Sequence, residues 1–136
     1  MVAGASLSAL EYGVATWSRR SLEAAELAPI GQTRDAVHRT LEQLEFQKID
    51  QRENSNGLWI RLQTADQQGR DVTITCTAVS PTVTKMKIRV GLLGDQAVSV
   101  ALHREIQKRI DADRQAGARQ DAAREAAAGS RDRENP

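Results

Sequence analysis

The residues best suited to chemistry in this sequence are an indole and several cations spaced two positions apart. Between residues 58 and 90, apolar side chains alternate with polar ones, which predicts strands that bury one face. The apolar side chains expected on the buried face are Leu58, Val72, Ile74, Met86 and Ile88. The opposite face then carries Trp59, Arg61, Thr73, Thr75, Thr77, Lys85, Lys87 and Arg89.

An indole among basic and hydroxyl side chains is suited to stacking on a base or a sugar, or to contacting another protein. We take six of these residues as a candidate interaction face: Trp59, Arg61, Thr75, Lys85, Lys87 and Arg89. The alternative is an ordinary solvated face, on which the N-terminal segment or Trp17 partly covers Trp59. The sequence leaves both interpretations open.

The residue types that catalysis or metal binding would need are present but are not grouped. His38 and His103 fall in separate helical segments without a second ligand at a metal-binding spacing, so we expect both at surface or boundary positions. The single cysteine, Cys76, excludes an intramolecular disulfide and is expected to be buried in a strand. No nucleophile elbow or catalytic triad is recognisable. We therefore expect no catalytic, cofactor-binding or metal-binding residues, no cofactor and no enzymatic activity.

Two glycines, Gly91 and Gly94, flank Leu92 and Leu93 just before a predicted helix. A glycine-containing turn at a helix N-terminus can bind an anion. Here Asp95 is expected to cap the helix, and its carboxylate would repel phosphate. A tight strand-to-helix corner is the favoured interpretation.

The composition is that of one small domain with an aliphatic core. The chain has 136 residues, of which 40% are hydrophobic and only 3% aromatic, so the core must consist mainly of Leu, Ile, Val and Ala. The formal net charge of +1 argues against a dominant attraction of the whole chain to DNA or anionic lipid. A local basic patch stays compatible with that value.

The two ends of the chain differ in composition from its middle. Residues 1–13 lack the basic and apolar regions of an intact signal peptide, and their Gly, Ala and Ser content is typical of a flexible linker. No segment approaches the ~18 apolar residues of a membrane-spanning helix. We expect a single domain at residues 14–110 and a polar, Ala/Arg-rich tail at 111–136. The tail is expected to extend a helix to about residue 128 and to be disordered at 129–136.

Periodicity predicts the elements within the domain. A first strand is expected in residues 14–27, and a helix from Gln32 to about Leu44, with Thr33 as its N-cap and with Val37 and Leu41 on its apolar stripe. Further strands are expected at residues 46–51, 58–63, 72–78 and 84–90, joined by short turns that include the hairpin signal Asn56-Gly57. A second helix after Asp95 carries the stripe Val98, Leu102, Ile106 and Ile110.

The predicted order is therefore β-α-β-β-β-β-α. Short spacings between the last four strands indicate an antiparallel meander. Each helix has one apolar face and so does the sheet, so both helices should cover the same side of it. The expected fold class is α+β, a two-layer sandwich.

Part of the sequence resembles a family of small bacterial proteins of unknown function. The run KIRVGLLGDQAVSVALHREI (residues 87–106) is similar to the family's end, where Ile-Arg-Val-Gly is followed by a short apolar pair and Gly-Asp. TRDAVHRTLEQLEF (33–46) is similar to its first helix and DVTITCTAVSPTVTKMKIRV (71–90) to its last two strands, and the resemblance covers residues 17–110. Many members are predicted envelope lipoproteins, with a lipid-bearing cysteine before a Gly/Ala-rich spacer. That cysteine is absent here, since Cys76 lies in a strand.

The resemblance implies a non-enzymatic bacterial envelope domain with a structural or protein-interaction role, bound to a protein partner or to a second copy of itself. Its location is then periplasmic or in the cell envelope if a native leader was removed, and otherwise cytoplasmic. Membrane attachment is expected only through a lipid anchor that this sequence lacks. An alternative is a small-ligand module that holds an apolar or anionic ligand between sheet and helices. Nucleic-acid binding on the open sheet face is the weakest alternative, because the net charge is near zero.

Overall fold

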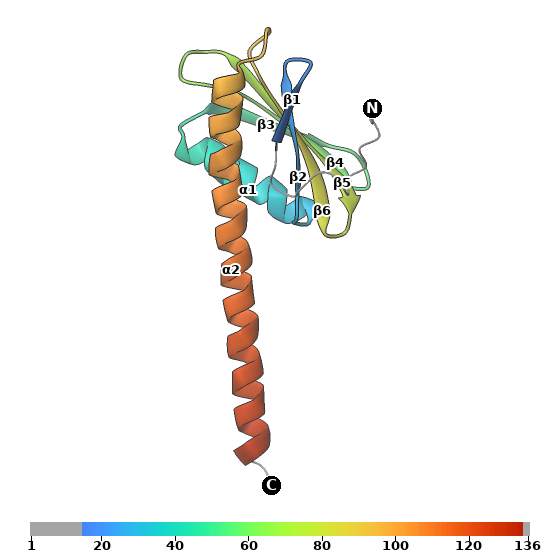
Figure 1. Cartoon of the computed structure of the whole chain (residues 1–136), viewed down its shortest axis with the longest axis vertical. Helices are drawn as coiled ribbons and strands as arrows, with labels where there is room; N and C mark the ends of the chain where they lie inside the picture. Colours follow the sequence, from blue (N-terminus) through green and yellow to red (C-terminus); the bar gives the residue numbers. More distant parts are fainter. Residues whose placement is uncertain (1–14, 135–136) are drawn as a thin grey trace.

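The computed structural model describes residues 15–134 as one antiparallel sheet and two helices (Figure 1). The elements are β1 (Ala15–Ser18), β2 (Ser21–Glu26), α1 (Ile30–Gln43), β3 (Gln47–Glu53), β4 (Trp59–Ala65), β5 (Asp71–Ser80), β6 (Val83–Val90) and α2 (Gln96–Glu134). The six strands lie in the order β1-β2-β6-β5-β4-β3, so the run from β3 to β6 is a meander. This confirms the expected α+β fold and its antiparallel meander. The linker expected at residues 1–13 lies outside the described residues.

Both helices pack on one face of the sheet. The register aligns Ile60 with Cys76 and Cys76 with Met86, and side chains aligned in this way point to the same face. These three residues belong to a single buried cluster with Val37 of α1 and Ile106 of α2. The sandwich therefore has one core, between the sheet and the two helices, as the apolar periodicity predicts.

The prediction of a single strand at residues 14–27 is wrong, because this segment forms the hairpin of β1 and β2. Its turn is made by Arg19 and Arg20, with φ values of 50° and 67°. Positive φ at both central residues gives a turn whose twist matches that of the flanking strands. Asn and Gly are the usual residues there, and their absence left the turn without a signal in the sequence. The sheet consequently has six strands where five were expected.

The first helix begins earlier than expected, at Ile30, and its N-cap is Pro29. The prediction that Thr33 caps the helix is wrong, since its hydroxyl donates within the first turn to the Pro29 carbonyl, 3.1 Å away. Proline needs no hydrogen-bond acceptor for its own nitrogen, which suits it to a helix start. The predicted apolar stripe is confirmed, because Val37 and Leu41 are fully buried.

Four of the five apolar residues predicted to face the helices are buried: Val72, Ile74, Met86 and Ile88. The prediction fails for Leu58, which is 50% exposed and lies just before β4 begins. Its backbone N–H is held by the side-chain oxygens of Asn54 and Asn56, at 3.0 and 3.1 Å. These bonds belong to the β3–β4 loop, so Leu58 is part of a turn rather than of the alternating strand.

The second helix leaves the sheet and extends far beyond it (Figure 1). Leu102, Ile106 and Ile110 are buried against the core, whereas the side chains of residues 111–128 are exposed or half-buried. The helix ends at Glu134, later than the expected end at about residue 128. Within the described residues, no helix combines the length and the apolarity that crossing a bilayer requires.

The corner between β6 and α2 depends on two glycines in the left-handed region. Gly91 has a φ of 72° and Gly94 a φ of 78°. A Cβ on Gly94 would lie 2.4 Å from the carbonyl oxygen of Arg20, whereas a Cβ on Gly91 would meet nothing within 4 Å. The expected tight strand-to-helix corner is thus present, and it packs directly on the β1–β2 turn.

We predict that Gly94→Ala destabilises the protein more than Gly91→Ala does. Both substitutions place a Cβ in the left-handed region, which costs about 1–2 kcal/mol. Only Gly94→Ala adds a clash with backbone, for which a further penalty of about 1–3 kcal/mol is expected. Urea denaturation of both variants measures the difference, and equal losses would show that the corner does not press on the β1–β2 turn.

Candidate functional site

The six residues of the predicted interaction face lie together on the side of the sheet away from the helices. In β4, Trp59 and Arg61 alternate with buried Ile60 and Leu62. The register sets Arg61 opposite Thr75 and Thr75 opposite Lys87, which makes a row across three strands. Parallel rows are Trp59–Thr77–Lys85 and Gln63–Thr73–Arg89. Threonines therefore run down the middle of the face, with cations along β6 and an indole and a guanidinium along β4.

A shallow hollow of about 420 Å³ lies on this face. Its lining residues are Arg19, Ser21, Trp59, Arg61, Gln63, Thr73, Thr75, Lys87 and Arg89. Four of these side chains are cations and none is a carboxylate. Such a lining favours an anion, because no fixed negative charge within it competes for the cations.

The carboxylates of the face lie at its margins. Glu23 of β2 is 4.0 Å from Lys85, and Asp50 of β3 is 3.5 Å from Arg52. Among residues 15–134, no carboxylate lies within ion-pair distance of Arg61, Lys87 or Arg89. The nearest carboxylate in the register is Glu23, which lies opposite Lys87 on the neighbouring strand and within ion-pair distance of Lys85.

The guanidinium of Arg61 lies beside Trp59 on the β4 side of the face. Its Cζ lies 5.6 Å from the centroid of the Trp59 ring, a cation–π arrangement that holds both side chains against the sheet. Its Nε is shielded from solvent and has no hydrogen-bond partner. A shielded donor without an acceptor costs roughly 1–3 kcal/mol. Arg61 therefore has donor capacity that the described residues do not use.

Three lining residues escaped the sequence-based prediction: Arg19, Ser21 and Gln63. Arg19 and Ser21 belong to the β1–β2 hairpin, whose turn was not recognised. That turn carries arginine at both left-handed positions, so the usual turn residues do not mark it in the sequence. Trp17, proposed as a cover for Trp59, is paired with Leu22 and packs against the core on the other face.

The two histidines have different surroundings. His38 is exposed and pairs with Glu42 on the surface of α1, as expected. The expectation of a surface or boundary position is wrong for His103, whose side chain is 4% exposed and whose Nε2 lies 2.5 Å from Oε1 of Glu26, itself 3% exposed. Periodicity along the chain does not predict this pair, because Glu26 lies in a strand 77 positions away. A buried hydrogen-bonded pair of this kind joins α2 to β2.

Cys76 is buried in β5 beneath the helices, as predicted. Burial, with a smaller effect of the nearby Glu26 charge, raises the pKa of its thiol to about 12. The thiol is therefore protonated at neutral pH and is a poor nucleophile. Within residues 15–134, no group of three or more His, Cys, Asp or Glu side chains could hold a metal ion.

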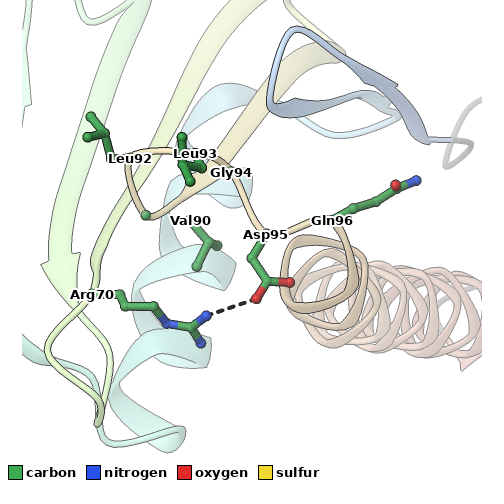
Figure 2. Close-up of a pocket in the computed structure, with 8 residues that line it drawn as sticks. Arg70, Val90, Leu92, Leu93, Gly94, Asp95 and Gln96 are labelled. Atoms are coloured by element: carbon green, nitrogen blue, oxygen red, sulfur yellow. Dashed lines mark hydrogen bonds and ion pairs between the residues drawn. The ribbon is translucent and has the colours of Figure 1, made fainter.

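The N-terminus of α2 is occupied by its own carboxylate, as Figure 2 shows. Asp95 accepts a hydrogen bond from the Val98 N–H at 3.0 Å and one from Arg70 at 2.8 Å. These two bonds hold the pKa of Asp95 below its ordinary value. Arg70 also donates to Asp66 at 2.8 Å, and although burial raises the pKa of Asp66, the hydrogen bonds from Arg70 and Gln68 lower it overall.

Comparison with known protein families matches residues 3–109 to the family described as "Protein of unknown function (DUF3568)". The match covers the sheet, α1 and the part of α2 that packs on the core, and ends within α2. No curated protein matches the chain.

We predict that the Glu26–His103 pair behaves as one unit in unfolding. Replacing only one partner, as in His103→Leu, leaves the other buried and unpaired, which should cost about 3–5 kcal/mol. The double variant Glu26→Leu/His103→Leu should be more stable than either single variant, because it removes both polar groups. Urea denaturation of all four proteins gives the coupling energy.

His38→Leu, on the exposed surface of α1, is the matched control and should change the free energy of unfolding by less than about 0.5 kcal/mol. Purely additive losses for Glu26 and His103 would show that the two side chains do not depend on each other.

We predict that Arg70 makes stability sensitive to acid. Asp66 and Asp95 have lowered pKa values in the folded chain, so their contribution is complete above the ordinary value of 3.8 and is lost as the pH falls through the folded-state pKa. Arg70→Met should lower stability at neutral pH and make the decline below about pH 4 shallower. Arg104→Met, on the exposed side of α2, should alter neither, and an unchanged acid slope in Arg70→Met would contradict the assignment.

Proposed function

Because this chain belongs to the DUF3568 family of unknown function, we propose a function from its surface: it is a non-enzymatic binding domain of the bacterial cell envelope. Its ligand is an acidic segment of a protein partner, held on the open face of the sheet. The observation that carries this proposal is the hollow on that face, whose lining includes Arg19, Arg61, Lys87 and Arg89 and no carboxylate.

The spacing of the cations supports an extended peptide as the ligand. Lys85, Lys87 and Arg89 alternate along β6, so neighbouring cations on this face are roughly 6.6–6.8 Å apart along the strand. An extended peptide with an acidic side chain at every second position has the same repeat. Its carboxylates would thus meet successive cations, while the threonines of β5 offer hydroxyl groups for its backbone.

Trp59 gives the face a site for specificity beyond charge. The ring is half-buried and lines the hollow, and the Cζ atom of Arg61 lies 5.6 Å from its centroid. An apolar or aromatic side chain of the partner would pack on the ring, in the manner of aromatic residues at protein interfaces. An acidic segment with one such side chain is therefore the ligand that we propose.

The proposed location in the cell envelope is supported by the sequence resemblance to predicted envelope lipoproteins. The alternative of a ligand between the sheet and the helices is disfavoured, because core side chains such as Leu62, Ile74 and Ile106 are fully buried. The same cations would attract nucleic acid, but a location outside the cytoplasm argues against nucleic acid as the ligand.

We predict that a fluorescently labelled oligoglutamate peptide binds the protein at low salt and dissociates as salt is added, because screening weakens exposed charge pairs. Arg61→Gln/Lys87→Gln removes two cations from the central row of the face. We expect this double variant to bind at least tenfold more weakly, which corresponds to a loss of about 1.4 kcal/mol of binding free energy. Fluorescence anisotropy measures the affinity, and circular dichroism checks that the variant is folded.

The control is Arg104→Gln/Lys108→Gln, which removes the same charge from the exposed side of α2. It should bind the peptide within twofold of the unaltered protein. Equal affinities of the two double variants would contradict a site on the sheet face. Tighter binding of an oligothymidylate of equal charge would favour nucleic acid over protein as the ligand.

A further inference from the structure

The loop between β6 and α2 exposes two adjacent leucines. Leu92 is 80% exposed and Leu93 is 73% exposed, more than the other exposed large apolar side chains of the described chain. Figure 2 shows both side chains at a hollow of about 610 Å³, which Arg70, Val90 and Asp95 also line. Exposed apolar area of this kind is unfavourable in water, and its usual explanation is contact with a partner.

The loop is held in this conformation by several contacts. Gly94 packs against the backbone of Arg20, Asp95 caps α2, and Arg89 donates a hydrogen bond to the Leu92 carbonyl at 2.6 Å. These contacts hold the corner in the conformation that exposes both leucines.

Cations surround this corner. Arg19 and Arg20 form the β1–β2 turn beside Gly94, and Arg89 lies next to Leu92 along the chain. No carboxylate among residues 15–134 forms an ion pair with these three arginines. Of the nearby carboxylates, Asp95 and Asp66 are paired with Arg70. Asp71 shares a hollow with Arg89 and Leu92, so the balance around the leucines is positive.

We propose that this corner docks on an anionic lipid bilayer, with Leu92 and Leu93 inserted among the acyl chains and Arg19, Arg20 and Arg89 bound to lipid phosphates. A bilayer fits better than a protein groove because the two leucines are exposed side by side in the sequence and three arginines without ion pairs in the described chain lie around the same corner. Apolar insertion and attraction of basic residues to anionic headgroups act together in this arrangement. The contact needs no covalent lipid and is separate from the central row of the interaction face.

Docking at this corner would orient the whole molecule. The corner leads directly into α2, which runs away from this end of the sheet (Figure 1). With 39 residues at about 1.5 Å each, α2 is roughly 58 Å long. Its far end would therefore be held well away from the lipid surface.

The test is flotation of the whole chain with phosphatidylcholine vesicles that contain or lack phosphatidylglycerol. We expect binding only to the vesicles with phosphatidylglycerol. Leu92→Ser/Leu93→Ser should weaken that binding at least tenfold, because the inserted side chains become polar. Arg20→Glu should weaken it at least fivefold, because it brings a negative charge to the headgroups.

The matched control is Leu27→Ser/Leu58→Ser, which alters two exposed leucines at the opposite end of the sheet and should bind within twofold of the unaltered chain. Arg61→Gln/Lys87→Gln should also bind within twofold, which separates this contact from the proposed peptide site. The proposal is overturned if the unaltered chain ignores phosphatidylglycerol, or if the two leucine variants bind equally. It is also overturned if Leu92→Ser/Leu93→Ser abolishes self-association in light scattering and leaves vesicle binding unchanged.

Discussion

Burial of a single sheet face beneath α1 and α2 is the constraint on which the rest of this structure depends. Aligned apolar residues of β2, β4, β5 and β6 form one cluster with the stripes of both helices. The period of two along each strand then decides where every polar side chain goes. Trp59, Arg61, Lys87 and Arg89 share the other face because their neighbours are required in the core.

Polar contacts fix how α2 lies on that core. Glu26 and His103 form a buried pair between β2 and α2, and Arg70 joins the β4–β5 turn to the N-cap of α2 through Asp66 and Asp95. Apolar packing alone would tolerate small shifts of a helix along the sheet, whereas these contacts have one geometry. They hold the start of α2 in place, and with it the loop that carries Leu92 and Leu93.

Local patterns in the sequence were sufficient for most of the fold. Alternation between residues 58 and 90 and the stripes through Leu41 and Ile106 identified the meander, both helices and their common side of the sheet. The Arg19-Arg20 turn was missed because its left-handed residues are not the usual Asn or Gly. The contact between Glu26 and His103 was not predicted, because periodicity reports on neighbouring residues and not on contacts between distant segments. Alternation also assembled the interaction face, but Arg19 joined it only through the unrecognised hairpin.

A chain with a net charge of only +1 can still present a basic surface, because its acidic side chains are buried, paired or placed outside that surface. Glu26 is buried, Asp66 and Asp95 are paired with Arg70, and Glu23 and Asp50 lie at the margins of the face. We propose this open face of the sheet as the binding surface. The most direct measurement follows the two indole N–H signals by NMR while an acidic peptide is added. Binding on the open face should shift the Trp59 signal together with the amides of Arg61, Thr75 and Lys87 and leave the Trp17 signal unchanged. Shifts confined to α2 or to Trp17 would show that the peptide binds elsewhere.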